Sequence, residues 1–115
     1  MTHPRKNLDA LIHSPVRFSL LAALCNLETV DFRFLVGLLE VSDSTLSQAL
    51  TTLAEAGFVE VTKEITGRRT KTWAAITPKG RAAFTEHLNA LQAIVAAGNE
   101  NAAREPDHDD TKVDP

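Results

Sequence analysis

The chain has 115 residues, of which 43% are hydrophobic, so it can form one small domain with a compact core but has no room for a large enzyme cleft. The formal net charge of −3 is unevenly distributed, because residues 98–115 hold six acidic and two basic residues, whereas residues 63–81 hold six basic residues and one acidic residue. Phosphate binding depends on such a local basic patch, so the acidic total does not exclude a nucleic-acid partner.

The cysteine count and the N-terminal residues exclude further classes. The chain has a single cysteine, Cys25, which rules out an internal disulfide and a cysteine metal cluster within one chain. The first residues, MTHPRKN, lack the apolar core of a signal peptide, and the most apolar run, residues 18–27, is too short to span a bilayer. We therefore expect a cytoplasmic protein with no membrane partner.

The N-terminal part begins with a predicted flexible tail over residues 1–7. A short apolar turn follows, formed by Leu8, Leu11 and Ile12. Ser14 and Pro15 then predict the start of a helix, because serine caps a helix well and proline is tolerated at the first helical position. The residues that follow leave little polar surface, so we expect this helix to lie at the centre of the domain.

Two further helices are predicted close together, as in a helix-turn-helix. Asp31 is the predicted N-cap of a second helix that ends at Glu40, and Ser42 is the predicted N-cap of a third. The third helix has apolar residues at helical spacing on one face, namely Leu46, Ala49, Leu50 and Leu53. Gly57 predicts its end, because glycine readily adopts the left-handed C-cap conformation.

A hairpin and a long helix complete the predicted elements. Residues 59–76 contain a strand with period-two alternation, the turn TGRR and a returning strand. Thr77 and Pro78 open a last helix, and Gly98 is predicted to end it. Residues 98–115 show no apolar periodicity, so we predict a disordered acidic tail.

The outward face of the third helix is a candidate DNA-reading surface. Helix-turn-helix proteins read bases mainly from the N-terminal part of this helix, where Gln48 can bond the N6 and N7 edge of adenine and hydroxyls can bond bases or phosphates. The candidate residues are Ser42, Ser44, Thr45, Ser47, Gln48, Thr51 and Thr52. The alternative is a solvated face of small polar residues.

The hairpin carries a second candidate contact with DNA, a basic tip. Arg68 and Arg69 lie at the turn and Lys71 follows them, and arginine suits a narrow, electronegative minor groove. A solvated turn would also explain these bases, but the helix that precedes them favours DNA contact. Trp73 could stack on a nucleotide, although we expect it to pack against the last helix.

The last helix carries a predicted dimer seam. Its apolar residues recur at spacings of four, three and four, namely Phe84, Leu88, Leu91 and Val95, as in two heptads. We predict a homodimer through this helix, with the apolar turn at Leu8, Leu11 and Ile12 as the second element of the interface. The alternative is that the seam packs entirely within its own domain.

Catalytic and metal-binding patterns are weak. No Ser/His/Asp or paired-carboxylate arrangement supports an enzyme, and we predict no cofactor. Asp9 and His13, with His87 of the partner subunit, could form an interfacial metal site, but we predict no metal centre. Cys25 is predicted to be an inert buried thiol, with redox sensing as the alternative.

Two motifs, LSQALTTLAEAGFVEV and ITPKGRAAF, resemble bacterial winged-helix regulators of the MarR and ArsR type, and the resemblance extends from Leu8 to about Val95. It implies a homodimer that binds a pseudo-palindromic operator and usually represses transcription, and it leaves open an unknown small-molecule effector. It also implies recognition by the helix holding Ser44, Thr45, Ser47 and Gln48, and wing contacts from Arg68 and Arg69.

The chain departs from that family in the recognition helix. Relatives often carry Arg, Lys or His beside the position of Ser47, whereas no such residue lies between Ser42 and Gly57. Attraction to phosphate must then come mostly from the wing and from other bases, namely Lys79, Arg81, Arg5, Lys6 and Arg33. The paired-cysteine and His-and-acid motifs of ArsR-like metal sensors are also absent.

The sequence thus predicts a mainly α protein with a small β-hairpin (α+β), a winged helix-turn-helix over residues 8–97 with a long C-terminal dimerisation helix. The predicted function is that of a homodimeric transcriptional regulator that binds double-stranded DNA sequence-specifically, with repression as the expected mode. The alternative is a winged-helix module that binds protein without specific DNA binding.

Overall fold

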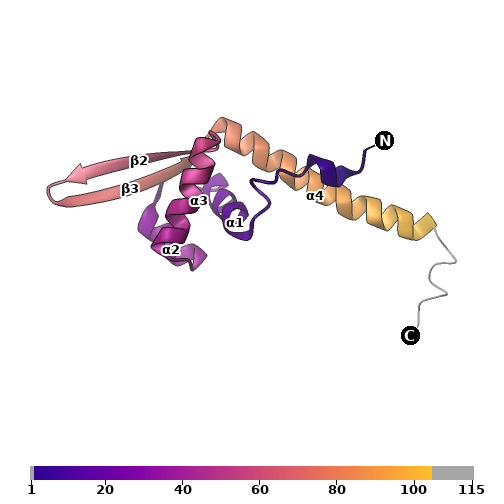
Figure 1. The fold of residues 1–115 in the computed structure, drawn as a ribbon, viewed down its shortest axis with the longest axis horizontal. Helices are drawn as coiled ribbons and strands as arrows, with labels where there is room; N and C mark the ends of the chain where they lie inside the picture. The colour runs from indigo at the N-terminus through magenta and orange to yellow at the C-terminus, as the bar shows by residue number, and fades with distance from the viewer. Residues whose placement is uncertain (1, 105–115) are drawn as a thin grey trace.

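The computed structural model describes residues 2–104 of the chain (Figure 1). Its elements in chain order are η1 (Pro4–Asn7), α1 (Pro15–Cys25), β1 (Val30–Asp31), α2 (Phe32–Leu39), α3 (Asp43–Glu55), β2 (Val59–Thr66), β3 (Arg69–Ile76) and α4 (Pro78–Arg104). α1, α2 and α3 pack together, and from this group the β2–β3 hairpin extends on one side and α4 on the other (Figure 1). The predicted winged helix-turn-helix fold with a long C-terminal helix is confirmed.

The starts of α1 and α3 have the predicted serine caps. Ser14 Oγ accepts a hydrogen bond from the Arg17 N–H at 3.4 Å, and Ser42 Oγ accepts one from the Thr45 N–H at 3.1 Å. Each bond satisfies an amide that the first helical turn leaves without a partner. After α3, Gly57 has a φ of 81°, so it turns the chain towards β2 as predicted.

α2 differs from its prediction at both ends. Asp31 occupies the N-cap position, but its side chain makes no capping hydrogen bond. Its backbone also belongs to β1, where it pairs with Trp73. The helix ends at Leu39 rather than Glu40, and Glu40 has a left-handed backbone with a φ of 55°. This sharp turn leads within two residues to the cap of α3.

In residues 2–104 the sheet has three antiparallel strands in the order β1-β3-β2. β2 and β3 pair along their full lengths, from the pair of Val59 with Ile76 to the pair of Thr66 with Arg69. Gly67 in the turn has a φ of 62°. The predicted hairpin is therefore confirmed. β1 was not predicted, because a strand of two residues is too short to show a period in the sequence. Its residues Val30 and Asp31 pair with Ala74 and Trp73 of β3.

Within the described residues, a single hydrophobic core connects the helices with the base of the sheet. Its largest fully buried apolar side chains are Ile12, Leu20, Leu21, Leu24, Leu35, Leu46 and Leu53. The predicted core face of α3 is confirmed, because all four of its apolar residues are buried. α1 contributes three of the core leucines, so it is the central helix that the sequence predicted.

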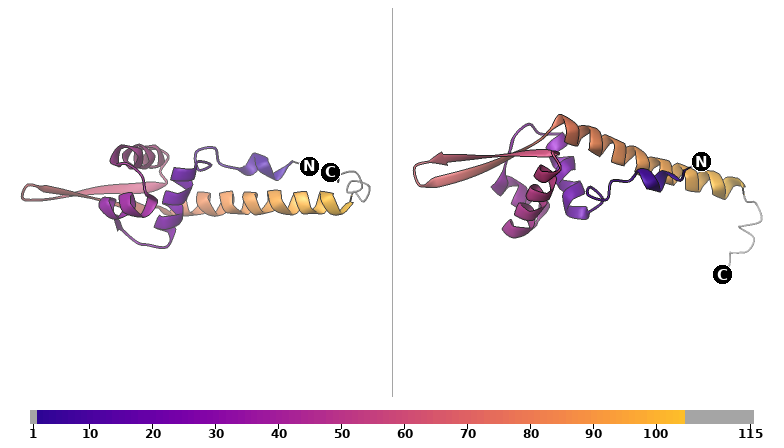
Figure 2. Two further views of the ribbon diagram at one scale, coloured as in Figure 1. Left: turned by 90° about the horizontal axis from the view of Figure 1, so that it is seen from below. Right: turned by 45° about the horizontal axis from the view of Figure 1, so that its top comes forward.

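Both ends of the described chain depart from the predictions. Residues 4–7, predicted as part of a flexible tail, form η1, which lies along α4 (Figure 2). α4 continues through Gly98 to Arg104, since Gly98 does not take the positive φ that would end a helix. The remainder of the predicted acidic tail lies outside the described residues. No helix within residues 2–104, α4 included, is long and apolar enough to cross a membrane.

The start of α4 is fixed to the turn between α3 and β2. Thr77 Oγ1 donates to the Gly57 carbonyl at 2.6 Å, and the Thr77 N–H donates to the Phe58 carbonyl at 3.0 Å. The Gly80 N–H donates to Thr77 Oγ1 at 2.9 Å. The backbones approach so closely that a Cβ on Gly80 would lie 2.1 Å from the Phe58 carbonyl oxygen. This contact sets the position of α4 relative to α3 and the hairpin.

His87 joins the N-terminal segment to α4. Its side chain is only 1% exposed, and its Nδ1 accepts a hydrogen bond from the Asp9 N–H at 3.0 Å. The neutral ring must therefore carry its proton on Nε2, which lies 3.3 Å from His13 Nδ1. The three residues considered for an interfacial metal site thus meet within one chain. Within the described residues, no group of three or more His, Cys, Asp or Glu could hold a metal ion.

Acid pH is expected to destabilise this contact. Burial lowers the pKa of His87 below its ordinary 6.5, nearby His13 lowers it further, and Asp9 opposes the shift. Because the unfolded chain binds the proton more readily, the stabilising contribution of neutral His87 is complete above pH 6.5 and is lost as the pH falls below it. Chemical unfolding across this pH range should show that loss. His87→Asn, which keeps an acceptor but does not titrate, should show a shallower dependence, and an unchanged slope would refute the assignment.

Candidate nucleic-acid interface

The polar face of α3 points away from the core, as predicted. Ser44, Ser47, Gln48 and Thr51 are exposed, as is Ser42, whereas Thr45 and Thr52 are half-buried. Ser42 Oγ also lies 2.9 Å from Thr45 Oγ1, so these two hydroxyls are already engaged in capping the helix. The side chains of α3 that are best placed to meet a ligand are therefore Ser44, Ser47, Gln48 and Thr51.

The hairpin presents a basic tip far from the core (Figure 1). Arg68 lies in the turn, Arg69 begins β3 and Lys71 follows on the same strand, and all three side chains are exposed. Within residues 2–104 the ion pair that forms is Arg33 with Asp43, so Arg68 and Arg69 form no ion pair with a described carboxylate, whereas Lys71 lies opposite Glu64 on the neighbouring strand. The tip therefore retains its positive charge for an anionic partner.

Trp73 does not occupy the position expected for it. Its Nε1 donates a hydrogen bond to Glu64 Oε1 at 3.2 Å, and Lys71 Nζ lies 5.0 Å from the centroid of its ring. Glu64 pairs with Lys71 across the hairpin, so all three side chains share one face of the wing. The expected packing of Trp73 against the last helix is replaced by packing on the wing itself.

The other bases considered for phosphate binding are distributed over the whole molecule. Arg33 forms an exposed ion pair with Asp43 at the start of α3, which offsets the acidic charge near the DNA-reading face. Arg81 Nη1 donates to the Cys25 carbonyl at 2.9 Å and so ties α4 to the end of α1. Arg5 and Lys6 lie in η1 along α4, away from the hairpin (Figure 1), so they are withdrawn from the bases considered for phosphate binding.

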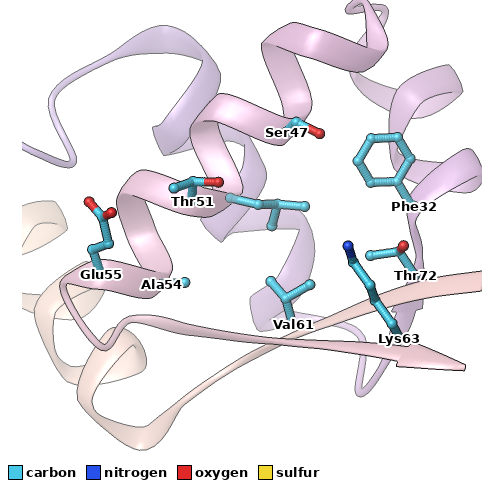
Figure 3. A pocket seen from close by; sticks show the side chains of 9 residues that line it. Phe32, Ser47, Thr51, Ala54, Glu55, Val61, Lys63 and Thr72 are labelled. Carbon is cyan, nitrogen blue, oxygen red and sulfur yellow. The ribbon is translucent and has the colours of Figure 1, made fainter.

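A hollow of about 480 Å³ separates α3 from the hairpin (Figure 3). We call it the wing hollow, and it is lined by Phe32, Ser47, Leu50, Thr51, Ala54, Glu55, Val61, Lys63 and Thr72. The ammonium of Lys63 extends from β2 towards α3 (Figure 3). Neither Lys63 nor Thr72 was a candidate from the sequence. The alternation of β2 could have identified Lys63, because it shares a face with Val59 and Val61, which pack against the core.

The predicted dimer residues fall into two groups. Ile12 and Phe84 belong to the core of their own chain, with exposed fractions of 0% and 7%, so a partner cannot reach them and they are withdrawn from the predicted interface. Leu8, Leu11, Leu88 and Leu91 are half-buried, and Val95 is 63% exposed. The surface still open to a partner therefore lies along the distal part of α4.

Cys25 is half-buried near the end of α1. Burial raises the pKa of its thiol, and the positive charge of Arg81 only partly opposes this shift. A raised pKa reduces the thiolate fraction that reacts with oxidants. The environment of Cys25 thus favours an inert thiol over a redox sensor.

A winged-helix DNA-binding domain consists of these parts, namely an exposed polar helix, a basic wing and a three-stranded sheet. Residues 16–95 match the family model described as a winged helix DNA-binding domain. The chain belongs to this family. The family is described by DNA binding, so the winged-helix protein is a DNA-binding protein rather than an enzyme.

Known proteins share this winged-helix arrangement. The chain is 40% identical over 78 residues to the uncharacterized protein MJ0432 of Methanocaldococcus jannaschii, covering 68% of this chain and 85% of that protein. A transcriptional regulator homologue from Pyrococcus horikoshii superposes with a TM-score of 0.75 at 20% identity, covering 84% of this chain and 97% of that one. A MarR-family regulator from Silicibacter pomeroyi superposes with a TM-score of 0.60 at 24% identity, covering 97% and 82%. The winged-helix protein therefore has the fold of MarR-like regulators.

Proposed function

We propose that the winged-helix protein is a sequence-specific transcriptional regulator that binds double-stranded DNA as a homodimer. The observation that carries the proposal is the presence, beside an exposed polar face on α3, of a wing tip whose Arg68 and Arg69 form no ion pair in the described chain. α3 enters the major groove, and Arg68 and Arg69 reach the adjacent minor groove. Repression follows when the bound dimer blocks access to a promoter.

The dimer is proposed from the distal half of α4. This half extends beyond the rest of the domain (Figure 2), with η1 along one side and Val95 exposed on another. An apolar residue at a heptad position of a projecting helix is typical of a helix that pairs with a second copy. Two copies would place two α3 helices against successive major grooves of a pseudo-palindrome.

A protein-binding module is the second candidate function. Phe34 and Leu38 are spaced by four residues on α2 and are 53% and 50% exposed, so they form an apolar strip that a protein could cover. α3 also lacks basic residues, which weakens its attraction to DNA. The charge of Arg68 and Arg69, which form no ion pair in the described chain, favours DNA over this alternative, since a protein partner does not require a basic tip.

Removing the basic tip tests the proposal. The double change Arg68→Ala with Arg69→Ala is expected to weaken binding to all DNA sequences. It should also reduce the slope of log affinity against log salt by up to about 1.8, because each phosphate contact contributes about 0.9. Fluorescence anisotropy at several salt concentrations measures both quantities. Changing Arg5 and Lys6 to alanine removes the same charge from η1 and serves as the control. Equal binding by the two double variants would exclude the wing from the mechanism.

A further inference from the structure

The wing hollow lies where DNA backbone must pass if the proposed function is correct, and the inference below rests on that function. With α3 in the major groove and the wing tip in the adjacent minor groove, one phosphodiester strand separates the two grooves. That strand has to cross the space between the two protein elements that enter them. In this protein that space is the wing hollow.

The lining of the hollow suits a phosphodiester. The Lys63 ammonium extends into it from β2, and the hydroxyls of Ser47 and Thr51 lie on the α3 side (Figure 3). Lys63 is exposed and forms no ion pair with any other described residue. Leu50, Val61 and Phe32 supply an apolar lining, against which a deoxyribose can rest. Ammonium and hydroxyl donors above apolar groups are the contacts that position a DNA backbone.

The hollow also divides the exposed face of α3 into two parts. Ser47 and Thr51 are one turn apart and line it, whereas Ser44 and Gln48, also one turn apart, do not. We propose that the wing hollow binds one backbone phosphate through Lys63, Ser47 and Thr51, which leaves Ser44 and Gln48 to read bases. Lys63 is thereby a positioning residue for DNA, and Ser47 and Thr51 change from base-reading candidates to phosphate contacts.

One carboxylate opposes this binding. Glu55 lines the hollow at the C-terminal end of α3, beyond Thr51, and its carboxylate is directed away from Lys63 (Figure 3), so its negative charge repels a phosphate held by Lys63 only at long range. The hollow therefore holds a phosphate less tightly than its donors alone would allow. Neutralising Glu55 without changing its shape should strengthen binding, which is a gain that damage to the fold would not produce.

The experiment measures binding of the full-length protein to two duplexes over a range of salt concentrations. One is the duplex that the protein enriches most from a random pool, called its preferred duplex, and the other has a random sequence. Lys63→Ala should weaken binding several-fold on both duplexes and reduce the salt slope by about one. Glu55→Gln should strengthen binding on both. Ser47→Ala should lose affinity equally on the two duplexes, whereas Gln48→Ala should lose it mainly on the preferred one. Lys6→Ala in η1 is the control for removing one positive charge, and thermal melting checks the fold of each variant.

The possible failures are distinguishable. If the unmodified protein binds neither duplex, the proposed function fails and the phosphate site fails with it. If the protein binds DNA but Lys63→Ala matches Lys6→Ala in affinity and salt slope, the phosphate site alone is overturned. A loss for Ser47→Ala that is confined to the preferred duplex would also overturn it, because that residue would then be reading bases.

Discussion

Replacing Gly80 with alanine is expected to destabilise the protein by about 1–3 kcal/mol or more. The added methyl group would lie 2.1 Å from the Phe58 carbonyl oxygen and 2.8 Å from its carbonyl carbon. Neither atom can move as a flexible side chain can, so either the start of α4 or the turn after α3 has to shift. Such a shift would break the hydrogen bonds that Thr77 makes with Gly57 and Phe58.

The control for this change is Gly37→Ala in α2. A Cβ at Gly37 would meet no atom within 4 Å, and alanine favours a helix over glycine, so that variant should be neutral or more stable by up to about 1 kcal/mol. Urea unfolding of both variants gives the comparison. If Gly80→Ala is as stable as Gly37→Ala, the close contact between α4 and the Phe58 backbone does not determine the fold.

Placing a charge at Val95 is expected to separate the proposed dimer. Val95 is 63% exposed in the single chain, so Val95→Glu should leave the fold of each protomer intact while burying an unpaired carboxylate in the seam. Light scattering should then report a monomer. DNA affinity should fall on the order of 100-fold or more, because simultaneous binding of two half-sites is lost.

The neighbouring residue provides the matched control. Ala96 is also exposed but lies about 100° further around the helix, outside the heptad seam. Ala96→Glu should therefore remain dimeric and bind DNA normally. A monomeric unmodified protein at micromolar concentration would reject the dimer, and it would favour the protein-binding alternative.

Local signals in the sequence predicted most of the fold. Ser14, Ser42 and Gly57 act within a few residues of themselves, so their capping roles could be read directly from the sequence. The hairpin was also predictable, because its alternation and its glycine turn are short-range features. Gly98 shows the limit of such signals, since glycine favours a helix end but α4 continues through it to Arg104.

Contacts between distant residues could not be predicted in this way. Asp9, His13 and His87 were considered together only across two subunits, whereas the path of the N-terminal segment brings them together in one chain. Nothing in the sequence distinguishes Gly80 from another glycine at a helix start, because its close approach to Phe58 depends on how α4 packs against the turn after α3. The position of Lys63 opposite Ser47 and Thr51 likewise depends on how the hairpin packs against α3.

Selecting DNA from a random pool with the purified protein, followed by sequencing of the bound fraction, tests the central claim most directly. A homodimer that reads bases with α3 should enrich an inverted repeat whose half-site centres lie about 10–10.5 base pairs, or a multiple of that distance, apart. The Gln48→Ala protein should enrich the same spacing with relaxed preference at one position in each half-site. A bound fraction with no enriched sequence would contradict sequence-specific recognition, and an enriched single half-site without its inverted copy would contradict the dimer.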